Sequence, residues 1–218
     1  VVLVGDAEQL QAIEAGAAFR ALTERHGAAE INEIRRQHEA WQREATRELA
    51  TGRTGAALDR YEAAGMVHSH ATREAARGAL VDGWDAVRRV RPEASQVMLA
   101  HTRADVAEIN QLARRRLRET GDQHVGGLGP DHLVQTERGE RFFAAGDRVM
   151  FLRNERSLGV KNGTLGTVEK IDGASLTVRL DGDDRRGVSF DLKDYAHIDH
   201  GYAATIHKSQ GVTVDHAH

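Results

Sequence analysis

The run of residues 201–211 holds the densest group of side chains that could do chemistry. Five polar side chains and a glycine lie within it: Thr205, His207, Lys208, Ser209, Gln210 and Gly211. Hydroxyl, imidazole, ammonium and amide groups can all bond to phosphate oxygens, and a glycine exposes its backbone N–H group to them. The run therefore predicts a phosphate-binding segment. The alternative is a polar loop that follows a core helix.

A second candidate is Gly5-Asp6-x-x-Gln9, which follows the apolar residues 1–4. The apolar run predicts a buried parallel strand, and ligands of open α/β sheets bind beyond the carboxyl ends of such strands. There Gln9 can bond to a phosphate oxygen or orient a water molecule without adding charge. The alternative is that Asp6 only caps a turn. A core strand at the very start also predicts that the chain is a piece of a longer protein.

Arg35, Arg36 and Gln37 form a third candidate, directly after a predicted strand at residues 31–34. The planar guanidinium group binds phosphate oxygens in pairs, and an arginine finger accelerates phosphoryl transfer by roughly a thousandfold or more. Two adjacent arginines are also common on a solvated surface, and the residues alone leave both possibilities open. The twelve histidines show no spacing typical of metal ligands, so no metal site is predicted.

Helices and strands alternate through the first half of the chain. Apolar periodicity predicts helices at residues 14–25, 38–50, 72–90 and 104–118, and strands at residues 1–4, 31–34, 66–70 and 96–100. This alternation predicts an α/β fold with a doubly wound parallel sheet.

The pattern changes after about Leu133 to short alternating runs separated by turn dipeptides. These dipeptides are Asn162-Gly163, Asp172-Gly173 and Asp181-Gly182. Each is a hairpin signal, and residues 160–168 predict a type I′ turn between two strands. We therefore expect a small antiparallel β-barrel or sheet from Phe142 to about Leu192.

The composition is that of an ordinary soluble globular protein, with 218 residues, 40% hydrophobic and 29% charged. There are no cysteines, which excludes a disulfide scaffold and favours a reducing compartment, so we expect a cytoplasmic protein. No run of roughly 18 apolar residues indicates a membrane span. The net charge of −3 gives no overall attraction to nucleic acid, so DNA binding would have to come from local clusters of positive charge.

Taken in order, these segments resemble the later motifs of the RecD-like branch of superfamily 1 DNA helicases. Residues 4–10 resemble motif III, residues 34–37 resemble motif IV, and residues 202–211 resemble motif V. Residues 146–154, with Lys161-Asn162-Gly163-Thr164, are similar to the small Src-homology-type barrel inserted in the second motor domain of that branch. They are most similar to the version found in TraA-type conjugative relaxases.

The resemblance implies a P-loop NTPase fold with two RecA-like motor domains, both incomplete. Residues 1–92 would be the C-terminal part of the first motor domain, and residues 93–218 would be the second. A small antiparallel β-barrel would be inserted in the second domain at about residues 142–194.

The resemblance also implies two sets of site residues. Contacts to the nucleotide fall on Gly5, Asp6, Gln9, Arg36, Gln210 and Gly211. Two of these would be catalytic, because Gln9 would sense the γ-phosphate and Arg36 would be the arginine finger. Contacts to single-stranded DNA fall on Thr102, Lys161, Asn162, Thr205, His207, Lys208 and Ser209.

The function implied is part of an ATP-dependent DNA helicase that moves 5′ to 3′ in conjugative DNA transfer. Its cofactors would be ATP and Mg²⁺. Its partners would be single-stranded DNA and the rest of the same polypeptide, which would contain a relaxase and the first motor motifs. No membrane partner is expected. The sequence contains no G-x-x-x-x-G-K-[ST] loop and lacks the acidic pair that holds Mg²⁺, so we expect no ATP hydrolysis by this chain alone. The alternatives are an ATPase-dead remnant that binds single-stranded DNA, which the few aromatic residues disfavour, and an ATPase that acts on RNA.

Overall fold

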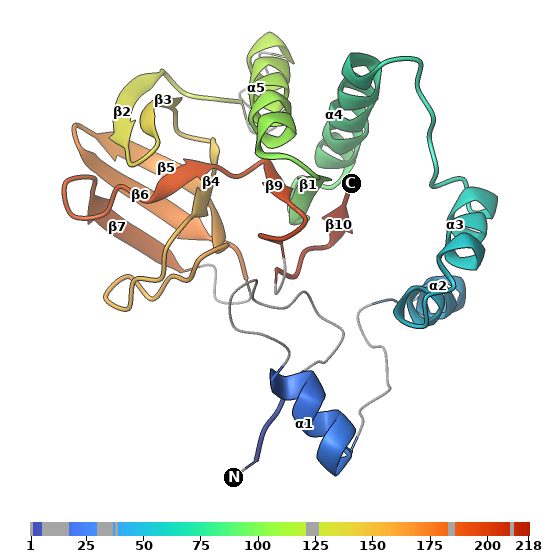
Figure 1. Cartoon of the computed structure of the whole chain (residues 1–218). Helices are drawn as coiled ribbons and strands as arrows, with labels where there is room; N and C mark the ends of the chain where they lie inside the picture. The colour runs from blue at the N-terminus through green and yellow to red at the C-terminus, as the bar shows by residue number, and fades with distance from the viewer. Residues whose placement is uncertain are drawn as a thin grey trace. The chain divides into compact units, whose positions relative to one another are not determined.

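The computed structural model of the chain describes residues 2–5, 18–29, 37, 39–120, 127–182, 186–209 and 212–218. They belong to two compact units, Val1–His70 and Ala71–His218, and each unit is described by itself (Figure 1). The boundary between two motor domains at residues 92 and 93 stays a prediction. No helix of the described residues is both long and apolar enough to cross a membrane.

The first unit is helical in its described part. Its helices are α1 Ala18–His26, α2 Ala40–Ala50 and α3 Thr54–Ala63. Helices α2 and α3 pack together through the rings of Trp41 and Tyr61, which meet edge to face with centroids 5.2 Å apart. Arg60 donates two hydrogen bonds to the carboxylate of Glu48, at 2.8 and 3.0 Å. The helix predicted at residues 38–50 is confirmed by α2, whereas α3 is not among the predicted helices.

Two of the strands predicted for this unit are not formed. Residues 2–5 and 66–70 have no strand structure, and Val2 and Val4 are 88% and 92% exposed. An apolar run becomes a buried strand only beside a hydrogen-bonding neighbour, and the described part of this unit contains no other strand. The strand predicted at residues 31–34 lies outside the described residues.

The second unit is built on a parallel sheet of three strands in the order β10-β1-β9. The sheet and its helices are α4 Arg73–Val90, β1 Gln96–Ala100, α5 Arg103–Thr120, β9 Ala203–Thr205 and β10 His216–Ala217. Met98 of β1 shares a buried cluster with Trp84 of α4 and Ile109 of α5, so both helices cover one face of this sheet. The helices predicted at residues 72–90 and 104–118 are confirmed, as is the strand at residues 96–100.

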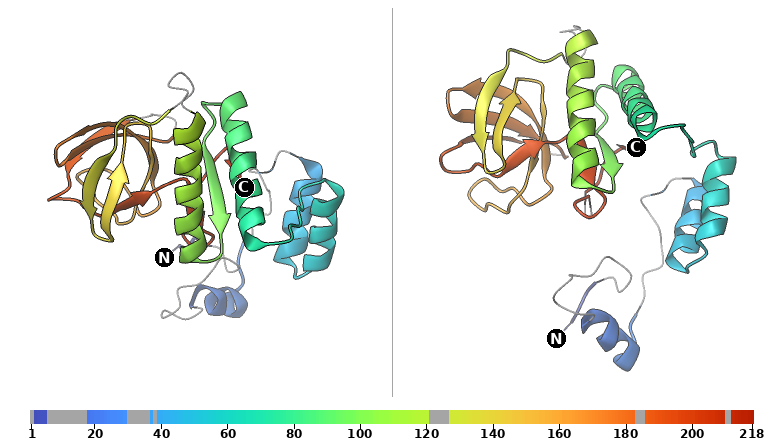
Figure 2. Two further views of the ribbon diagram at one scale, coloured as in Figure 1. Left: turned by 90° about the horizontal axis from the view of Figure 1, so that it is seen from above. Right: turned by 45° about the horizontal axis from the view of Figure 1, so that its top comes forward.

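The opposite face of the parallel sheet packs against antiparallel strands. There Val97 and Ala204 share a buried cluster with Met150 and Leu165. The predicted α/β architecture is therefore present, but the doubly wound arrangement is not formed within the described residues, because the antiparallel elements occupy the second face. Figure 2 shows α5 between α4 and these antiparallel elements.

The antiparallel elements follow α5 along the chain and precede β9. They are a hairpin of β2 His132–Thr136 and β3 Gly139–Phe143, and a sheet of β4 Arg148–Phe151, β5 Leu165–Asp172, β6 Ser175–Leu180, β7 Gly187–Asp191 and β8 Ile198–His200. The sheet has the strand order β7-β6-β5-β4-β8. Val134 and Phe143 of the hairpin share a buried core with Phe151, Val178 and Ile198 of the sheet. The predicted antiparallel region is thus present as a sheet with a packed hairpin.

The dipeptide Asn162-Gly163 forms a turn, in which the N–H of Thr164 donates to the carbonyl oxygen of Lys161 at 2.9 Å, but this turn does not join two paired strands as predicted. It lies in a long loop between β4 and β5, where the N–H of Asn162 donates to Oδ1 of Asn154 at 2.8 Å. The N–H of Gly163 donates to the carbonyl oxygen of Phe151, also at 2.8 Å. These bonds fold the turn back onto the end of β4. Asp172-Gly173 does form the turn between β5 and β6.

Candidate nucleic-acid interface

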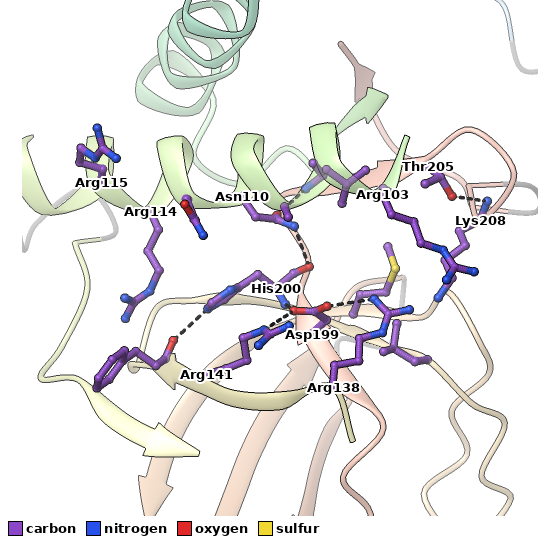
Figure 3. Close-up of a pocket in the computed structure, with 18 of the residues that line it drawn as sticks. Arg103, Asn110, Arg114, Arg115, Arg138, Arg141, Asp199, His200, Thr205 and Lys208 are labelled. Atoms are coloured by element: carbon purple, nitrogen blue, oxygen red, sulfur yellow. Dashed lines mark hydrogen bonds and ion pairs between the residues drawn. The ribbon is translucent and has the colours of Figure 1, made fainter. Parts of the chain in front are cut away.

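A cleft of about 1040 Å³ lies in the second unit, between α5 and the antiparallel elements (Figure 3). Seven cationic side chains line it: Arg103, Arg114, Arg115, Arg118, Arg138, Arg141 and Lys208. Three carboxylates also line the cleft: Asp131, Glu140 and Asp199. The lining therefore has an excess of four positive charges. A concave surface of one sign concentrates its field, so this cleft attracts a polyanion.

Helix α5 turns its cations toward the cleft because its apolar side chains occupy the other face. Ile109 and Leu117 are buried on the side that packs against α4 and the parallel sheet. Arg103, Arg114 and Arg118 are spaced so that they lie together on an adjoining side of the helix and line the cleft. The amphipathic pattern of this helix thus positions one wall of the site.

Thr102 caps the start of α5. The N–H of Asp105 donates to Oγ1 of Thr102 at 3.0 Å, and the Thr102 hydroxyl donates to Oδ2 of Asp105 at 2.6 Å. Arg77 of α4 donates to the other oxygen of Asp105, also at 2.6 Å. The bonds from Thr102 and then Arg77 lower the pKa of Asp105 from 3.8 to about 2. The hydroxyl of Thr102 is thus engaged within the fold, and its contact with DNA stays a prediction.

We call one end of the cleft the paired end and define it by Arg114, Arg118, Asp131 and Asp147. Nε of Arg114 lies 3.1 Å from both carboxylate oxygens of Asp147, and Nη2 of Arg114 pairs with Asp131. Arg118 also pairs with Asp131, and it donates to the carbonyl oxygen of Gly129 at 2.6 Å. The positive charge of both arginines is therefore offset within the protein.

Asp147 is completely buried and has a full set of donors. Besides Arg114, the N–H of Ala144 donates to it at 2.7 Å and the hydroxyl of Tyr202 at 2.7 Å. Burial and then the charge of Asp147 raise the pKa of Tyr202 well above its usual value, so this hydroxyl keeps its proton and remains a donor. The carboxylate thereby connects α5, the turn before β4 and the segment that leads into β9.

We call the other end the open end and define it by Arg103, Arg138, Arg141, Asp199 and Lys208. Arg138 and Arg141 share the carboxylate of Asp199, at 3.0 and 3.4 Å. Within the described part of the chain, Arg103 and Lys208 have no carboxylate partner. Burial, followed by the charges of Arg138 and Arg103, lowers the pKa of Lys208. Four cations therefore face one carboxylate at this end (Figure 3).

Asn110 fixes the backbone that enters β9. Its Oδ1 accepts hydrogen bonds from the N–H groups of Tyr202 at 3.1 Å and Ala203 at 2.9 Å. Gly201, immediately before, lies so close to β4 that a Cβ atom would stand 2.7 Å from the carbonyl carbon of Val149. The path of the chain toward the predicted phosphate-binding segment is therefore set by a buried amide and by a position that excludes a side chain.

Two of the residues predicted to contact DNA, Thr205 and Lys208, line the cleft. Thr102 lies near Thr205, because Ala100 at the end of β1 pairs with Thr205 at the end of β9. The two strands are parallel, so their carboxyl ends meet at one edge of the sheet, as expected for a ligand site.

The loop that carries Lys161 and Asn162 also reaches this edge. Gly163 has a φ of 89° and lies against the segment after β9, where a Cβ atom would stand 3.3 Å from the carbonyl oxygen of Lys208. His207 is exposed, and Oγ of Ser209 donates to the carbonyl oxygen of Ile206 at 2.8 Å. None of the side chains of Lys161, Asn162, His207 and Ser209 lines the cleft.

Five of the six predicted nucleotide contacts lie outside the described residues: Asp6, Gln9, Arg36, Gln210 and Gly211. The sixth, Gly5, lies in an extended segment where a Cβ atom would stand 3.2 Å from the ring of Phe19. The nucleotide site, with its ATP and Mg²⁺, therefore stays a prediction. Within the described residues, no group of three or more His, Asp or Glu side chains could hold a metal ion.

Most residues of the cleft are not among the predicted site residues, and these include Arg103, Arg114, Arg118, Arg138 and Arg141. The spacing of the arginines on α5 was available as a signal, because three of them share one helix face. The hairpin residues carry no such signal, since their place opposite α5 depends on packing between distant segments.

The chain is similar in sequence to known helicases and conjugation proteins. Residues 1–72 match the AAA domain family. Over 216 residues, or 99% of this chain, it is 45% identical to the conjugal transfer protein TraA of Agrobacterium fabrum, and it covers 19% of that protein. It is 35% identical over 100 residues, 39% of this chain and 13% of the relative, to the ATP-dependent RecD2 DNA helicase of Deinococcus radiodurans.

Among solved structures, the chain is similar to the Pif1 helicase from Bacteroides in complex with ADP-AlF3 and ssDNA. The match covers 85% of this chain and 44% of the Pif1 chain. The TM-score is 0.50 at 22% sequence identity, which shows a common fold. The chain thus shares its fold with this Pif1 structure, and its first 72 residues match an AAA domain. The resemblance to TraA-type proteins is confirmed by the sequence identity along nearly the whole chain. The chain spans about a fifth of the length of the TraA proteins that it matches.

Proposed function

We propose that this chain is part of the motor of an ATP-dependent DNA helicase that acts in conjugative DNA transfer, and that its basic cleft holds single-stranded DNA. The observation that carries the proposal is the charge of the cleft, with seven cations against three carboxylates. Phosphate groups of a strand neutralise such cations and release counterions, which drives binding. The similarity to TraA and RecD2 supports a role in moving DNA.

The open end is where the strand would bind most tightly. Arg103 and Lys208 have no carboxylate partner in the described part of the chain, so both ammonium and guanidinium donors are available to phosphate oxygens. Thr205 adds a hydroxyl at the end of β9. The guanidinium groups of Arg138 and Arg141 are already oriented by Asp199, which limits the side-chain freedom lost on binding.

The rest of the motor follows from the same proposal. Residues 1–92 and 93–218 would be parts of two RecA-like motor domains, and about residues 142–194 would form a small Src-homology-type barrel. ATP hydrolysis, with Mg²⁺, would need a phosphate loop that these 218 residues do not contain. Gln9 and Arg36 would act on the γ-phosphate, and the movement would run 5′ to 3′.

Single-stranded DNA binding by this chain tests the proposal directly. An oligonucleotide titrated at two salt concentrations, with and without ATP, should bind in a salt-dependent way and without an effect of ATP. Absence of binding at low salt would contradict the assignment of the cleft. The same titration with an RNA of equal sequence separates a DNA motor from an enzyme that acts on RNA.

The assignment of Arg36 needs the complete protein with its phosphate loop. There Arg36→Ala should abolish ATP turnover and leave nucleotide binding largely intact, because an arginine finger stabilises transition-state charge. Arg35→Ala is the matched control, and it should retain turnover. If the complete protein binds DNA but never hydrolyses ATP, the alternative of a DNA-binding remnant replaces the motor.

A further inference from the structure

We propose that Gly163 is a positioning residue for DNA binding, because its lack of a side chain lets the loop between β4 and β5 lie against the turn at residues 205–209 and fixes the place of Lys208 in the cleft. This inference rests on the proposed function, since it requires that Lys208 binds a strand. Gly163 is buried and does not line the cleft, so it can act on a bound strand only through its neighbours.

Lys208 takes its place from the turn that carries it. The N–H groups of Lys208 and Ser209 both donate to the carbonyl oxygen of Thr205, at 2.9 and 3.0 Å, and Thr205 is the last residue of β9. Burial, and then the charges of Arg138 and Arg103, lower the pKa of Lys208, so its ammonium group lies among the cations of the open end. A displacement of the Lys208 backbone therefore moves this charge relative to the other cations.

The loop that contains Gly163 is anchored to the core of the antiparallel sheet. The N–H of Gly163 donates to the carbonyl oxygen of Phe151 at 2.8 Å, and the N–H of Phe151 donates to the carbonyl oxygen of Thr164 at 2.9 Å. Phe151 is the last residue of β4 and is completely buried among the apolar side chains of that sheet. The loop is therefore a fixed support for the segment that lies against it.

The contact between the loop and the turn leaves little room for a side chain at Gly163. A Cβ atom there would stand 3.3 Å from the carbonyl oxygen of Lys208, a separation that requires the neighbour to move by a few tenths of an ångström. The φ of 89° is also a value that L side chains rarely adopt. Because the hydrogen bonds to Phe151 hold the loop, the turn at residues 205–209 must take up the displacement, and Lys208 moves with it.

The test measures how the full chain binds a thymidine oligonucleotide at several salt concentrations. Gly163→Ala should reduce the slope of log binding constant against log salt concentration by about 0.3 to 0.7, up to the contribution of one phosphate contact. If the plots for the variant and the wild type meet near 1 M salt, the variant should bind about two- to fivefold more weakly at 0.1 M. Gly163→Ala should add no further loss to Lys208→Ala, because the contact that it disturbs is already absent there.

Two variants separate this contact from backbone strain. Gly173, in the turn between β5 and β6, also has a positive φ, of 59°, but a Cβ atom there would meet nothing within 4 Å beyond its chain neighbours. Gly173→Ala should lower the midpoint of thermal unfolding through strain alone and bind DNA as the wild type does. Gly163→Asn should lower this midpoint less than Gly163→Ala, since asparagine adopts positive φ values more readily, but it should weaken DNA binding as much because it has the same Cβ atom.

Four results would overturn the inference. They are wild-type binding by Gly163→Ala, wild-type binding by Gly163→Asn, an equal loss of binding in Gly173→Ala, or a further loss when Gly163→Ala is added to Lys208→Ala. In each of these cases salt-dependent binding by the wild type would still support the proposed function. If the wild-type chain binds no strand, the proposed function and this inference fail together.

Discussion

The paired end and the open end of the cleft hold similar side chains, but they differ in how charge is balanced. At the paired end Arg114 and Arg118 meet carboxylates, those of Asp131 and the buried Asp147. At the open end, within the described residues, Arg103 and Lys208 meet none, and Asp199 serves two arginines. The positive charges at the paired end are therefore neutralised within the protein, and those at the open end are not.

The difference separates two uses of a cation. A guanidinium group with a buried carboxylate partner stabilises the fold, because its removal would leave that carboxylate without a counter-charge. A cation that lies among other cations is repelled by them, and a bound phosphate group reduces this repulsion. The lowered pKa of Lys208, caused by burial and then by Arg138 and Arg103, is a sign of this condition. We therefore expect mutations at the paired end to act on stability, and mutations at the open end to act on DNA binding.

The largest effect should come from Asp147→Asn at the paired end. The substitution leaves Arg114 without its buried counter-charge, and breaking such a pair costs roughly 3–5 kcal/mol. Urea unfolding followed by the fluorescence of Trp84, with Trp41 replaced by Phe in both proteins, measures the second unit. Trp84 is a suitable reporter because its ring lies 5.6 Å from that of Tyr202, a partner of Asp147.

Asp131→Asn is the control for this experiment. Asp131 pairs with the same Arg114, but its side chain is 41% exposed, so the loss should be about 1 kcal/mol or less. Equal losses in the two variants would show that burial does not separate these carboxylates, and the paired end would then not be a structural anchor.

The next largest effect should come from the double variant Arg103→Ala/Lys208→Ala at the open end. Loss of two phosphate contacts should reduce the slope of log binding constant against log salt concentration by about 1.4 for single-stranded DNA. If the plots for the variant and the wild type meet near 1 M salt, the variant should bind about 25-fold more weakly at 0.1 M. Thermal unfolding should change little. Fluorescence anisotropy at several salt concentrations measures the slope.

A double variant with the same change in net charge is the control. Lys170→Ala/Arg179→Ala removes two cations from β5 and β6, both outside the cleft and both paired with nearby carboxylates. It should bind DNA almost as the wild type does. If it weakens binding as strongly, then the overall field of the protein, and not the open end, attracts the strand.

Much of the fold of the second unit could be predicted from the sequence because its signals are local. The helix at residues 104–118 shows its apolar face in the spacing of Ile109 and Leu117, and both are buried as that spacing requires. Whether residues 1–4 and 66–70 form strands could not be predicted from local signals. An apolar run carries no information on whether a neighbouring strand is present, and residues 2–5 and 66–70 form none here.

A smaller part of the candidate site could be predicted. Thr205 and Lys208 belong to one short segment with an unusual density of donors, and both line the cleft. Arg138 and Arg141 stand on a hairpin that reaches the cleft through its packing against the sheet, and Asp199 joins them from β8, far along the chain. No local pattern contains that juxtaposition, so it had to be seen in three dimensions.

A smaller effect is expected from Thr102→Ala, which tests whether every polar group near the open end serves DNA. Loss of the helix cap should cost roughly 0.5–2 kcal/mol of stability and leave DNA affinity unchanged. The pKa of Asp105 should rise from about 2 toward its usual value, because the bond from Thr102 is the first cause of its depression. NMR titration of the carboxyl group measures this shift.

The pH dependence of Thr102→Ala gives a second check. A carboxylate whose pKa is depressed by folding adds stability above its unfolded pKa, and this contribution is lost as the pH falls through about 2. The difference in stability between the wild type and Thr102→Ala should therefore shrink in acid. Weaker DNA binding with unchanged stability would instead assign Thr102 to the strand.

The smallest effect should come from Asp199→Asn, and its sign decides how the open end works. The substitution removes the negative charge from this end while an amide oxygen can still accept a bond from Arg138. If excess charge alone attracts the strand, affinity should rise by up to about fivefold, since a unit charge near a phosphate in water contributes about 1 kcal/mol. Glu140→Gln, which makes the same change in charge without touching Arg138, should then have a similar effect. If Asp199→Asn weakens binding while Glu140→Gln strengthens it, the carboxylate orients the two arginines, and the open end differs from the paired end by preorganisation as well as by unbalanced charge.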